Sequence, residues 1–182
     1  MSDPLVPFSV TYTEQGIGLH QAVAAAGFLL RNVDGAWFAS DPAVQAIITG
    51  YNPVPSAQQA AIKAAQAHYD GIIAAGFFYQ GKSFQIDPAS QANMTAMAAM
   101  AQASIADAAA APWPAGFVWI AADNSQVAMT AAQCLAFAFA AGSYVSACVL
   151  CLRGLKDRIL AAASLAALGA IDVTAGWPTN GS

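Results

Sequence analysis

The motif Ala-Gly-Phe occurs three times in the sequence and divides the chain into similar parts. It stands at residues 26–28, 75–77 and 115–117. A short apolar run, a turn-forming group and a second apolar run follow each copy, which is the pattern of a β-hairpin. Alanine-rich segments typical of helices precede the first two copies. The sequence therefore predicts a repeated helix–glycine–hairpin–helix unit. Since alanine makes up about a quarter of the chain, chance recurrence is the alternative.

The three predicted hairpins are defined by their turn residues. Asp-Gly between two apolar runs is a strong short-range hairpin signal. The turns, each with the two runs that it joins, are Asp34-Gly35 between 28–33 and 36–39, Gln80-Gly81-Lys82 between 77–79 and 83–86, and Asp123-Asn124-Ser125 between 117–122 and 126–129. Both faces of the third hairpin are apolar, so we expect other elements to cover it on both sides.

Capping residues predict where the helices begin. An Asp, Ser or Thr side chain at the N-cap accepts a hydrogen bond from a free backbone N–H, and proline is tolerated at the next position. The predicted caps are Asp41 and Asp87, each before a proline, Ser56 and Ser164, and Thr130 with Gln133 as a capping box. The helices then span residues 57–75, 88–110, 131–160 and 165–168, with Met94, Met97, Ala101 and Ile105 on one face of the second. The proline-containing segments 53–55 and 112–114 are predicted to be extended links.

The chain is poor in charge. Charged residues make up 9% of it, whereas about 25% is usual in soluble domains. We infer that much of the surface is buried against other subunits. The alternative is a monomer that is prone to associate and whose surface is covered by small residues. The net charge is −4 and the six basic residues are scattered, so the composition argues against nucleic-acid binding. The N-terminus has neither the basic nor the apolar region of a signal peptide.

The segment Thr130–Leu152 has no charged residue and is long enough to cross a bilayer. Gln133, Gly142 and several serines and alanines argue instead for a helix buried in an assembly, which shows the same pattern. The three cysteines, at 134, 148 and 151, also lie in this region. A zinc site in this region would need further Cys or His ligands, and the histidines of the chain are His20 and His68, so we expect buried thiols in a reducing cytoplasm.

The sequence contains no complete set of catalytic groups. His20 lies near Glu14 and His68 near Asp70, but neither is next to a nucleophile in a strained turn. Gly16-Ile17-Gly18 lacks the third glycine of a dinucleotide-binding motif, and most aspartates belong to predicted turns and caps. The sequence therefore predicts a protein that is not an enzyme, with no catalytic, cofactor-binding or metal-binding residues and no cofactor.

Four segments of the chain have a distinctive sequence: 84–93 (Phe-Gln-Ile-Asp-Pro-Ala-Ser-Gln-Ala-Asn), 117–124 (Phe-Val-Trp-Ile-Ala-Ala-Asp-Asn), 129–133 (Met-Thr-Ala-Ala-Gln) and 171–178 (Ile-Asp-Val-Thr-Ala-Gly-Trp-Pro). Through them the sequence, from about residue 40 onward, resembles an uncharacterised domain family common in tailed-phage genomes. The genes of this family commonly lie beside tail-fibre genes, and its members are described as tail-fibre or tail-fibre-assembly proteins. The resemblance implies no particular catalytic or binding residues.

Together these observations predict an α+β, mainly helical fold with long helices interleaved with two or three short β-hairpins. We expect an N-terminal module at 1–52, a tail-fibre-associated domain at 53–178 and a tail at 179–182. The resemblance implies a virion structural protein of the phage tail that is assembled in the host cytoplasm and packs against its own copies or other tail proteins. A tail-fibre assembly chaperone and a membrane-active protein that uses residues 130–152 are the alternatives. The candidate interaction residues are Met94, Met97, Phe117, Trp119, Phe137, Phe139 and Trp177.

Overall fold

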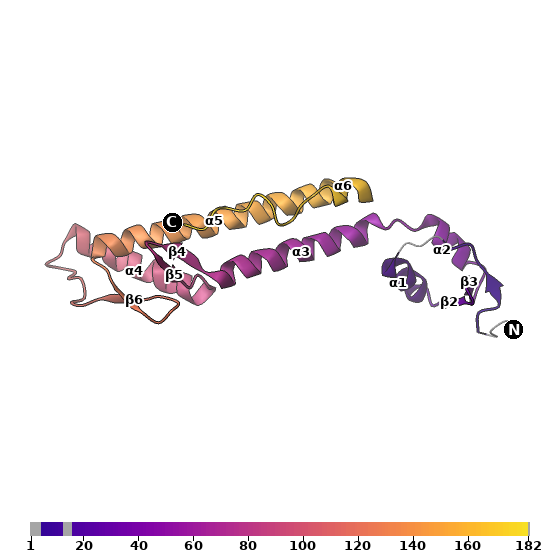
Figure 1. Cartoon of the computed structure of the whole chain (residues 1–182), viewed down its shortest axis with the longest axis horizontal. Helices are drawn as coiled ribbons and strands as arrows, with labels where there is room; N and C mark the ends of the chain where they lie inside the picture. The colour runs from indigo at the N-terminus through magenta and orange to yellow at the C-terminus, as the bar shows by residue number, and fades with distance from the viewer. Residues whose placement is uncertain (1–4, 13–15, 182) are drawn as a thin grey trace. The chain divides into compact units, whose positions relative to one another are not determined.

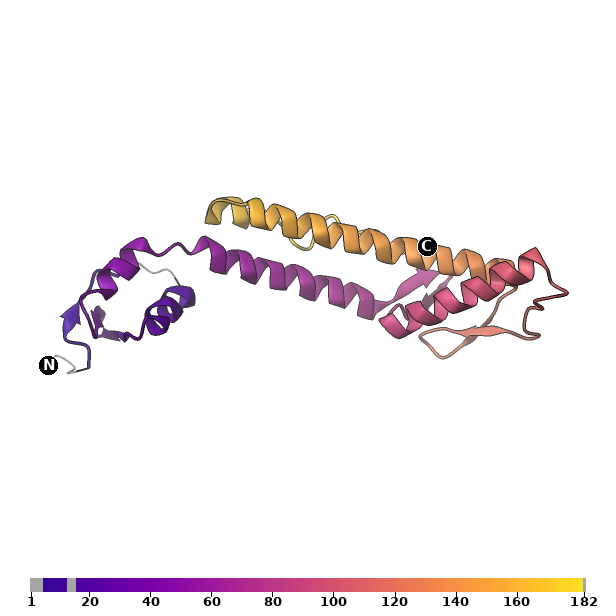
Figure 2. The same ribbon diagram turned by 180° about the vertical axis from the view of Figure 1, so that it is seen from behind.

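The structure is a computed structural model that describes residues 5–12 and 16–181 (Figures 1 and 2). In this part of the chain six helices alternate with three small antiparallel sheets, which confirms the predicted mainly helical α+β fold. The elements in chain order are β1 (Phe8–Ser9), α1 (Ile17–Ala25), β2 (Leu30–Val33), β3 (Ala36–Ala39), α2 (Val44–Gly50), α3 (Val54–Ala75), β4 (Phe77–Tyr79), β5 (Lys82–Phe84), α4 (Pro88–Ala106), β6 (Val118–Ile120), β7 (Gln126–Ala128), α5 (Ala131–Ala161) and α6 (Leu165–Gly169).

The chain forms two compact units, and each draws on two separate parts of the sequence. The first unit comprises Met1–Ala60 and Ala162–Ala170, and the second comprises Ala61–Ala161 and Ile171–Ser182. The modules predicted from the sequence, 1–52 and 53–178, are continuous stretches of chain, whereas these units are defined by contacts. Contacts between distant segments, which determine compact units, are not visible in local sequence patterns.

The first unit contains a three-stranded sheet of order β1-β3-β2. Asp34 and Gly35 have φ angles of 51° and 86° and form the predicted two-residue turn between β2 and β3. β1, which was not predicted, pairs with β3 over only two residues, too few for an alternating pattern to be visible. The buried core of this unit consists of Val10, Leu19, Val23, Ala39, Val44 and Ile48.

Two predicted helix starts in this unit need correction. The Asp41 carboxylate accepts a hydrogen bond from the Ala43 N–H at 2.7 Å, but α2 begins only at Val44, after a tight turn that starts at Asp41. Conversely, α3 begins at Val54 rather than at residue 57, so that Pro55 lies within its first turn. A proline is tolerated there because the first backbone N–H groups of a helix have no intrahelical partner.

In the second unit α4 and α5 pack side by side, and the part of α3 that belongs to this unit runs along α5 (Figures 1 and 2). The Asp87 carboxylate caps α4 as predicted, because it accepts hydrogen bonds from the N–H groups of Ala89 and Ser90. Thr130 and Gln133 form the predicted reciprocal capping box at the start of α5. These caps set the starts of α4 and α5.

α4 ends at Ala106, four residues before the predicted end. The Asp107 side chain accepts hydrogen bonds from the N–H groups of Ala109 and Ala110, and this local turn replaces further helix. The predicted apolar face is also corrected at its end, because Ser104 is buried whereas Ile105 is exposed.

The second and third hairpins lie beside each other. The turn between β4 and β5 contains only Gln80 and Gly81, one residue fewer than predicted, and both have positive φ. The Ala122 N–H donates to the Ser83 carbonyl oxygen at 2.8 Å. The Lys82 ammonium lies 2.8 Å from the Asp123 carboxylate, and its hydrogen bond holds the pKa of that carboxyl well below the usual range. The hairpins therefore brace each other.

The C-terminal segment returns to the start of β4. The Asn180 side chain accepts a hydrogen bond from the Phe78 N–H at 2.9 Å and donates one to the Gly76 carbonyl oxygen at 3.0 Å. The position of Gly76 requires glycine, because its φ is 83° and a Cβ atom would lie 2.5 Å from the Phe84 carbonyl oxygen. Residue 180, which was predicted to belong to a separate tail, thus takes part in the second unit.

Candidate interaction surface

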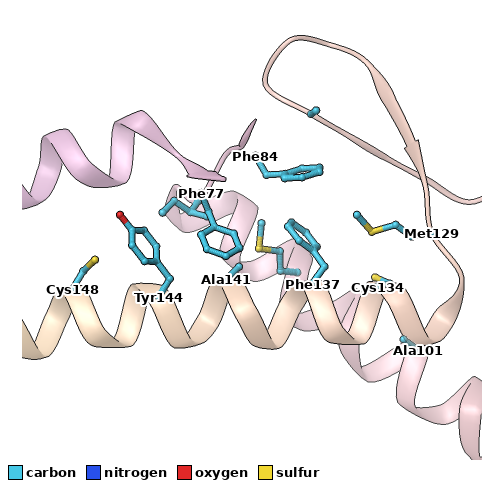
Figure 3. Close-up of a cluster of buried hydrophobic side chains, with 12 residues drawn as sticks. Phe77, Phe84, Ala101, Met129, Cys134, Phe137, Ala141, Tyr144 and Cys148 are labelled. Carbon is cyan, nitrogen blue, oxygen red and sulfur yellow. The ribbon is translucent and has the colours of Figure 1, made fainter. Parts of the chain in front are cut away.

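α5 presents two apolar faces. One is buried and consists of Cys134, Phe137, Ala141, Tyr144 and Cys148, at alternating spacings of three and four residues. This spacing places them on one side of a helix, where they meet β4, β5 and α4 (Figure 3).

The opposite face of α5 carries large apolar side chains that residues 5–12 and 16–181 leave partly or mostly exposed. Phe139 is 65% exposed, Leu150 69% and Val149 47%. Phe137 and Phe139 are only two residues apart, but the helical turn of about 100° per residue directs them to opposite sides. α5 is therefore apolar on its buried side and also on its outer side.

A groove between α4 and α5 adjoins this outer face. Its volume is about 370 Å³. Small side chains, among them Ala98, Ala138 and Gly142, form much of its lining, and Phe139 stands at one wall. A second, shallow depression runs along α5 itself from Phe139 to Leu150 and is lined between them by Ala138, Gly142, Ser143, Ser146 and Ala147.

The face formed by the two helices is uncharged over most of its length. α4 contains no Asp, Glu, Lys or Arg, and α5 has none before Arg153, which forms an exposed ion pair with Asp157 at 3.1 Å. Depletion of charge is typical of the centre of protein–protein interfaces. Surface helices without a partner usually carry charged residues on their outer side.

Of the sequence-predicted interaction residues, one lies openly on the surface. Phe139 is exposed, whereas Phe137 and Met94 are buried in the core of the second unit. The other four are partly buried and pack against this core: Met97, Phe117, Trp119 and Trp177. The structure thus brings most of these residues together as the support of the surface.

Trp119 belongs to a row of rings that anchors the third hairpin. Its ring centroid lies 5.4 Å from that of Phe137 on α5 and 6.2 Å from that of Phe117. Ile120 on the opposite face of the hairpin is 50% exposed, so the expectation that both faces are covered is corrected for this position. Val118, on the same face as Ile120, is partly buried, so this face is covered at one end of the strand and open at the other.

Leu150, Val149 and the groove were not among the residues predicted from the sequence. A signal for them exists: Ala132, Ala136, Phe139, Ser143, Ser146 and Leu150 follow the same alternation of three and four residues as the buried face. Two such stripes on one helix indicate two packing faces. In the part of the chain that the structure describes, α5 is also the one helix long and apolar enough to cross a membrane, by length and composition alone.

The cysteines lie beneath this surface. Burial raises the pKa of Cys148, and the pKa of Tyr144 is raised to about 12, first by burial and then by the adjacent Cys148. Burial also raises the pKa of Cys134. Near neutral pH these groups stay protonated, which makes the thiols poor nucleophiles. Within the described residues no group of three or more His, Cys, Asp or Glu side chains is placed to hold a metal ion.

The two histidines pack against aromatic rings. In the first unit the Tyr12 hydroxyl and His20 Nε2 are 3.1 Å apart, and the Tyr12 ring stacks on Trp37 with centroids 4.1 Å apart. Glu14, which the sequence places near His20, lies outside the described residues. In the second unit the His68 ring lies 5.3 Å from the Trp177 ring. Asp70, its neighbour in the sequence, accepts a hydrogen bond from Gln66.

A comparison with protein families identifies one match, to a domain of unknown function, DUF4376, over residues 56–175. This range includes α4, α5 and the second and third hairpins, and thus the whole candidate surface. No curated protein and no solved structure matches the chain. Because the matched range covers more than half of the sequence, the chain belongs to the DUF4376 family.

Proposed function

We propose that this protein is a non-enzymatic structural component of a tailed-phage virion, associated with the tail fibre, that works by packing against other subunits. It is assembled in the host cytoplasm and then resides in the tail as a fibre, tail-tip or baseplate accessory subunit. The phage association rests on the resemblance carried by segments 84–93, 117–124, 129–133 and 171–178.

The observation that carries the proposal is the uncharged outer face of α4 and α5. Phe139, Val149 and Leu150 are exposed on it beside an apolar groove of about 370 Å³. An uncharged face that exposes several large apolar side chains is typical of proteins that bind another protein. The opposite side of α5 packs the core through Phe137 and Tyr144, so the surface stands on a well-packed support.

Two other functions use the same surface. A tail-fibre assembly chaperone would hold an apolar segment of a nascent fibre in the groove and then release it. A membrane-active protein would insert α5, which has the required length and hydropathy. Insertion would first have to separate the buried side of α5 from α4 and from the hairpins, at the cost of the core contacts of Phe137 and Tyr144.

Mass spectrometry of purified virions of the phage that carries the gene tests the proposal. A structural component is expected at a fixed ratio to the other tail proteins. A chain that is abundant in infected cells and missing from virions would instead support the chaperone. A chain that stays in the membrane pellet after carbonate extraction would support the membrane-active protein.

A further inference from the structure

We propose that the α4–α5 face binds a second copy of this chain, with the two α5 helices antiparallel and related by a two-fold axis that passes between residues 144 and 145. The inference rests on the proposed function and deepens it, because it names the surface, the partner and the symmetry of the subunit contact. The order of side chains on α5, the groove beside Phe139 and the area of the face support this contact.

Along the centre of its outer face α5 has the same order of side-chain sizes in both directions, whereas Val149 at one edge is mirrored by the smaller Ala140. Going outward from the point between 144 and 145, the outer face first has Ser143 and Ser146, then Gly142 and Ala147, and then the large Phe139 and Leu150. A two-fold contact joins identical patches, so each residue of one copy must fit the residue at the mirrored position of the other. In the antiparallel pair Ser143 meets Ser146, and Phe139 meets Leu150.

The sizes of these side chains allow close contact. The four small residues at the centre let the two helix backbones approach, as small residues do where helices cross. Leu150 of the second copy then lies beside Phe139, at the wall of the groove between α4 and α5. The groove offers about 370 Å³ of apolar space for it, and the symmetry repeats this contact. Each copy supplies both the protruding side chain and the groove.

The area of the face is adequate for a dimer. α4 has 19 residues and α5 has 31, so at about 1.5 Å per residue and about 10 Å in width the pair presents roughly 750 Å². Each partner buries about 800 Å² in an interface of standard size. The antiparallel arrangement also separates the Arg153–Asp157 pairs of the two copies, because each faces alanines at 136 and 132 of the other. A parallel pair would bring the two Arg153 side chains together.

Sedimentation of the full chain and of single variants tests the surface. The wild type is expected at twice the 18.5 kDa mass of one chain at micromolar concentration. Leu150→Glu is expected to sediment as a folded monomer, with its helix content measured by circular dichroism, since it places a charge in the contact. Ile17→Glu is the matched control: Ile17 is another exposed apolar residue, in the first unit and outside the face, and this variant is expected to remain a dimer.

Crosslinking tests the symmetry. Ala136 is expected to face position 153 of the other copy, whereas the two Ala136 positions are 17 residues apart along the antiparallel pair, or about 25 Å. A mixture of Ala136→Cys and Arg153→Cys chains, both carrying Cys151→Ser, is treated with a short bis-maleimide. We expect crosslinks in the mixture and almost none in either chain alone. Crosslinks in each chain alone would show a parallel pair and overturn the inference.

The remaining outcomes separate this inference from the proposed function. A wild-type dimer that survives Leu150→Glu, or a wild type that stays monomeric while it is found in virions, overturns the two-fold contact and leaves the structural role intact. If Leu150→Glu dissociates the dimer as expected but the wild-type protein is missing from virions, only the proposed function is overturned. Binding of the wild type to phospholipid vesicles in place of dimerisation shows that the face meets a membrane and overturns the inference.

Discussion

The Asp87 side chain shows how much of a helix start can depend on one residue. Its carboxylate accepts hydrogen bonds from the N–H groups of Ala89 and Ser90 and from the Ser90 hydroxyl. We predict that Asp87→Ala lowers the melting temperature by about 2–5 °C, since α4 then starts with unsatisfied N–H groups. Asp70→Ala, which removes an exposed side-chain hydrogen bond from Gln66 on α3, is the control and is expected to change it by less than about 1 °C. Equal effects of the two changes would contradict the capping role.

The same carboxylate makes the stability of the folded chain depend on pH. The hydrogen bonds from Ser90 lower the pKa of Asp87 below its ordinary value of about 3.9. The unfolded chain therefore takes up the proton at a higher pH than the folded chain. The contribution of Asp87 is present above about pH 4 and is lost as the pH falls through the lower folded value. Melting curves between neutral and acidic pH should show a smaller loss in Asp87→Asn than in the wild type.

The three thiols are expected to differ in reactivity. Cys134 and Cys148 are buried and burial raises the pKa of both, whereas Cys151 is partly exposed and its thiol donates to the Gly176 carbonyl oxygen at 3.4 Å. We predict that a thiol reagent modifies Cys151 first and the other two only as the fold opens. The rates are measured by mass spectrometry under native conditions, with Cys151→Ser as the control. Rapid modification of Cys148 would show that the α5 core is open.

At the scale of elements, α5 offers two phenylalanines with opposite roles. Phe137 is fully buried, and its ring lies 4.6 Å from that of Phe84. We predict that Phe137→Ala lowers the free energy of unfolding by about 3–5 kcal/mol, because it leaves a cavity in the core. Phe139→Ala should leave the helix content unchanged and weaken self-association, since the ring is exposed. Urea unfolding and sedimentation of both variants measure the two effects, and a strongly unfolded Phe139→Ala would place that ring in the core instead.

Elements whose start or turn has a local cause were predicted well. The Asp34-Gly35 turn, the Asp87 cap and the Thr130–Gln133 capping box depend on residues at most three positions apart, so their signals are complete within a short window. The helix boundaries that were predicted wrongly also depend on local interactions, because a side-chain turn and a further turn of helix compete for the same residues. The sequence predicts Asp107 within a helix, but its side chain forms a turn. It also predicts Pro55 in an extended link, but Pro55 lies in the first turn of α3.

At the scale of the whole molecule, the C-terminal segment closes the second unit. Asn180 bonds to backbone groups about 100 positions earlier in the sequence, at Gly76 and Phe78. We predict that Asn180→Ala lowers the free energy of unfolding by about 1–2 kcal/mol, because two hydrogen bonds are lost. Thr179→Ala is the neighbouring control and is expected to have a smaller effect. Urea unfolding measures both, and an unchanged Asn180→Ala would show that the segment does not hold β4.

The candidate surface was only partly predictable. The low charge content indicated a buried outer surface, and Phe139 was selected from the sequence. The sequence also predicted Phe137 and Met94 as interaction residues, but both lie in the core. The residue type alone does not show whether an apolar side chain on a helix faces the core or the solvent. Leu150 and the groove beside Phe139 became visible only when α4 was placed against α5.

The sequence by itself determined the helices, the hairpins and their order, since caps, turns and glycines act through bonds between near neighbours. Tertiary structure alone decided that residues 162–170 join the first unit, that β1 pairs with β3, and that Asn180 holds β4. It also decided which of the two apolar faces of α5 is buried. Those choices depend on contacts between residues far apart in the sequence, whose free energy is gained only after the intervening chain has folded.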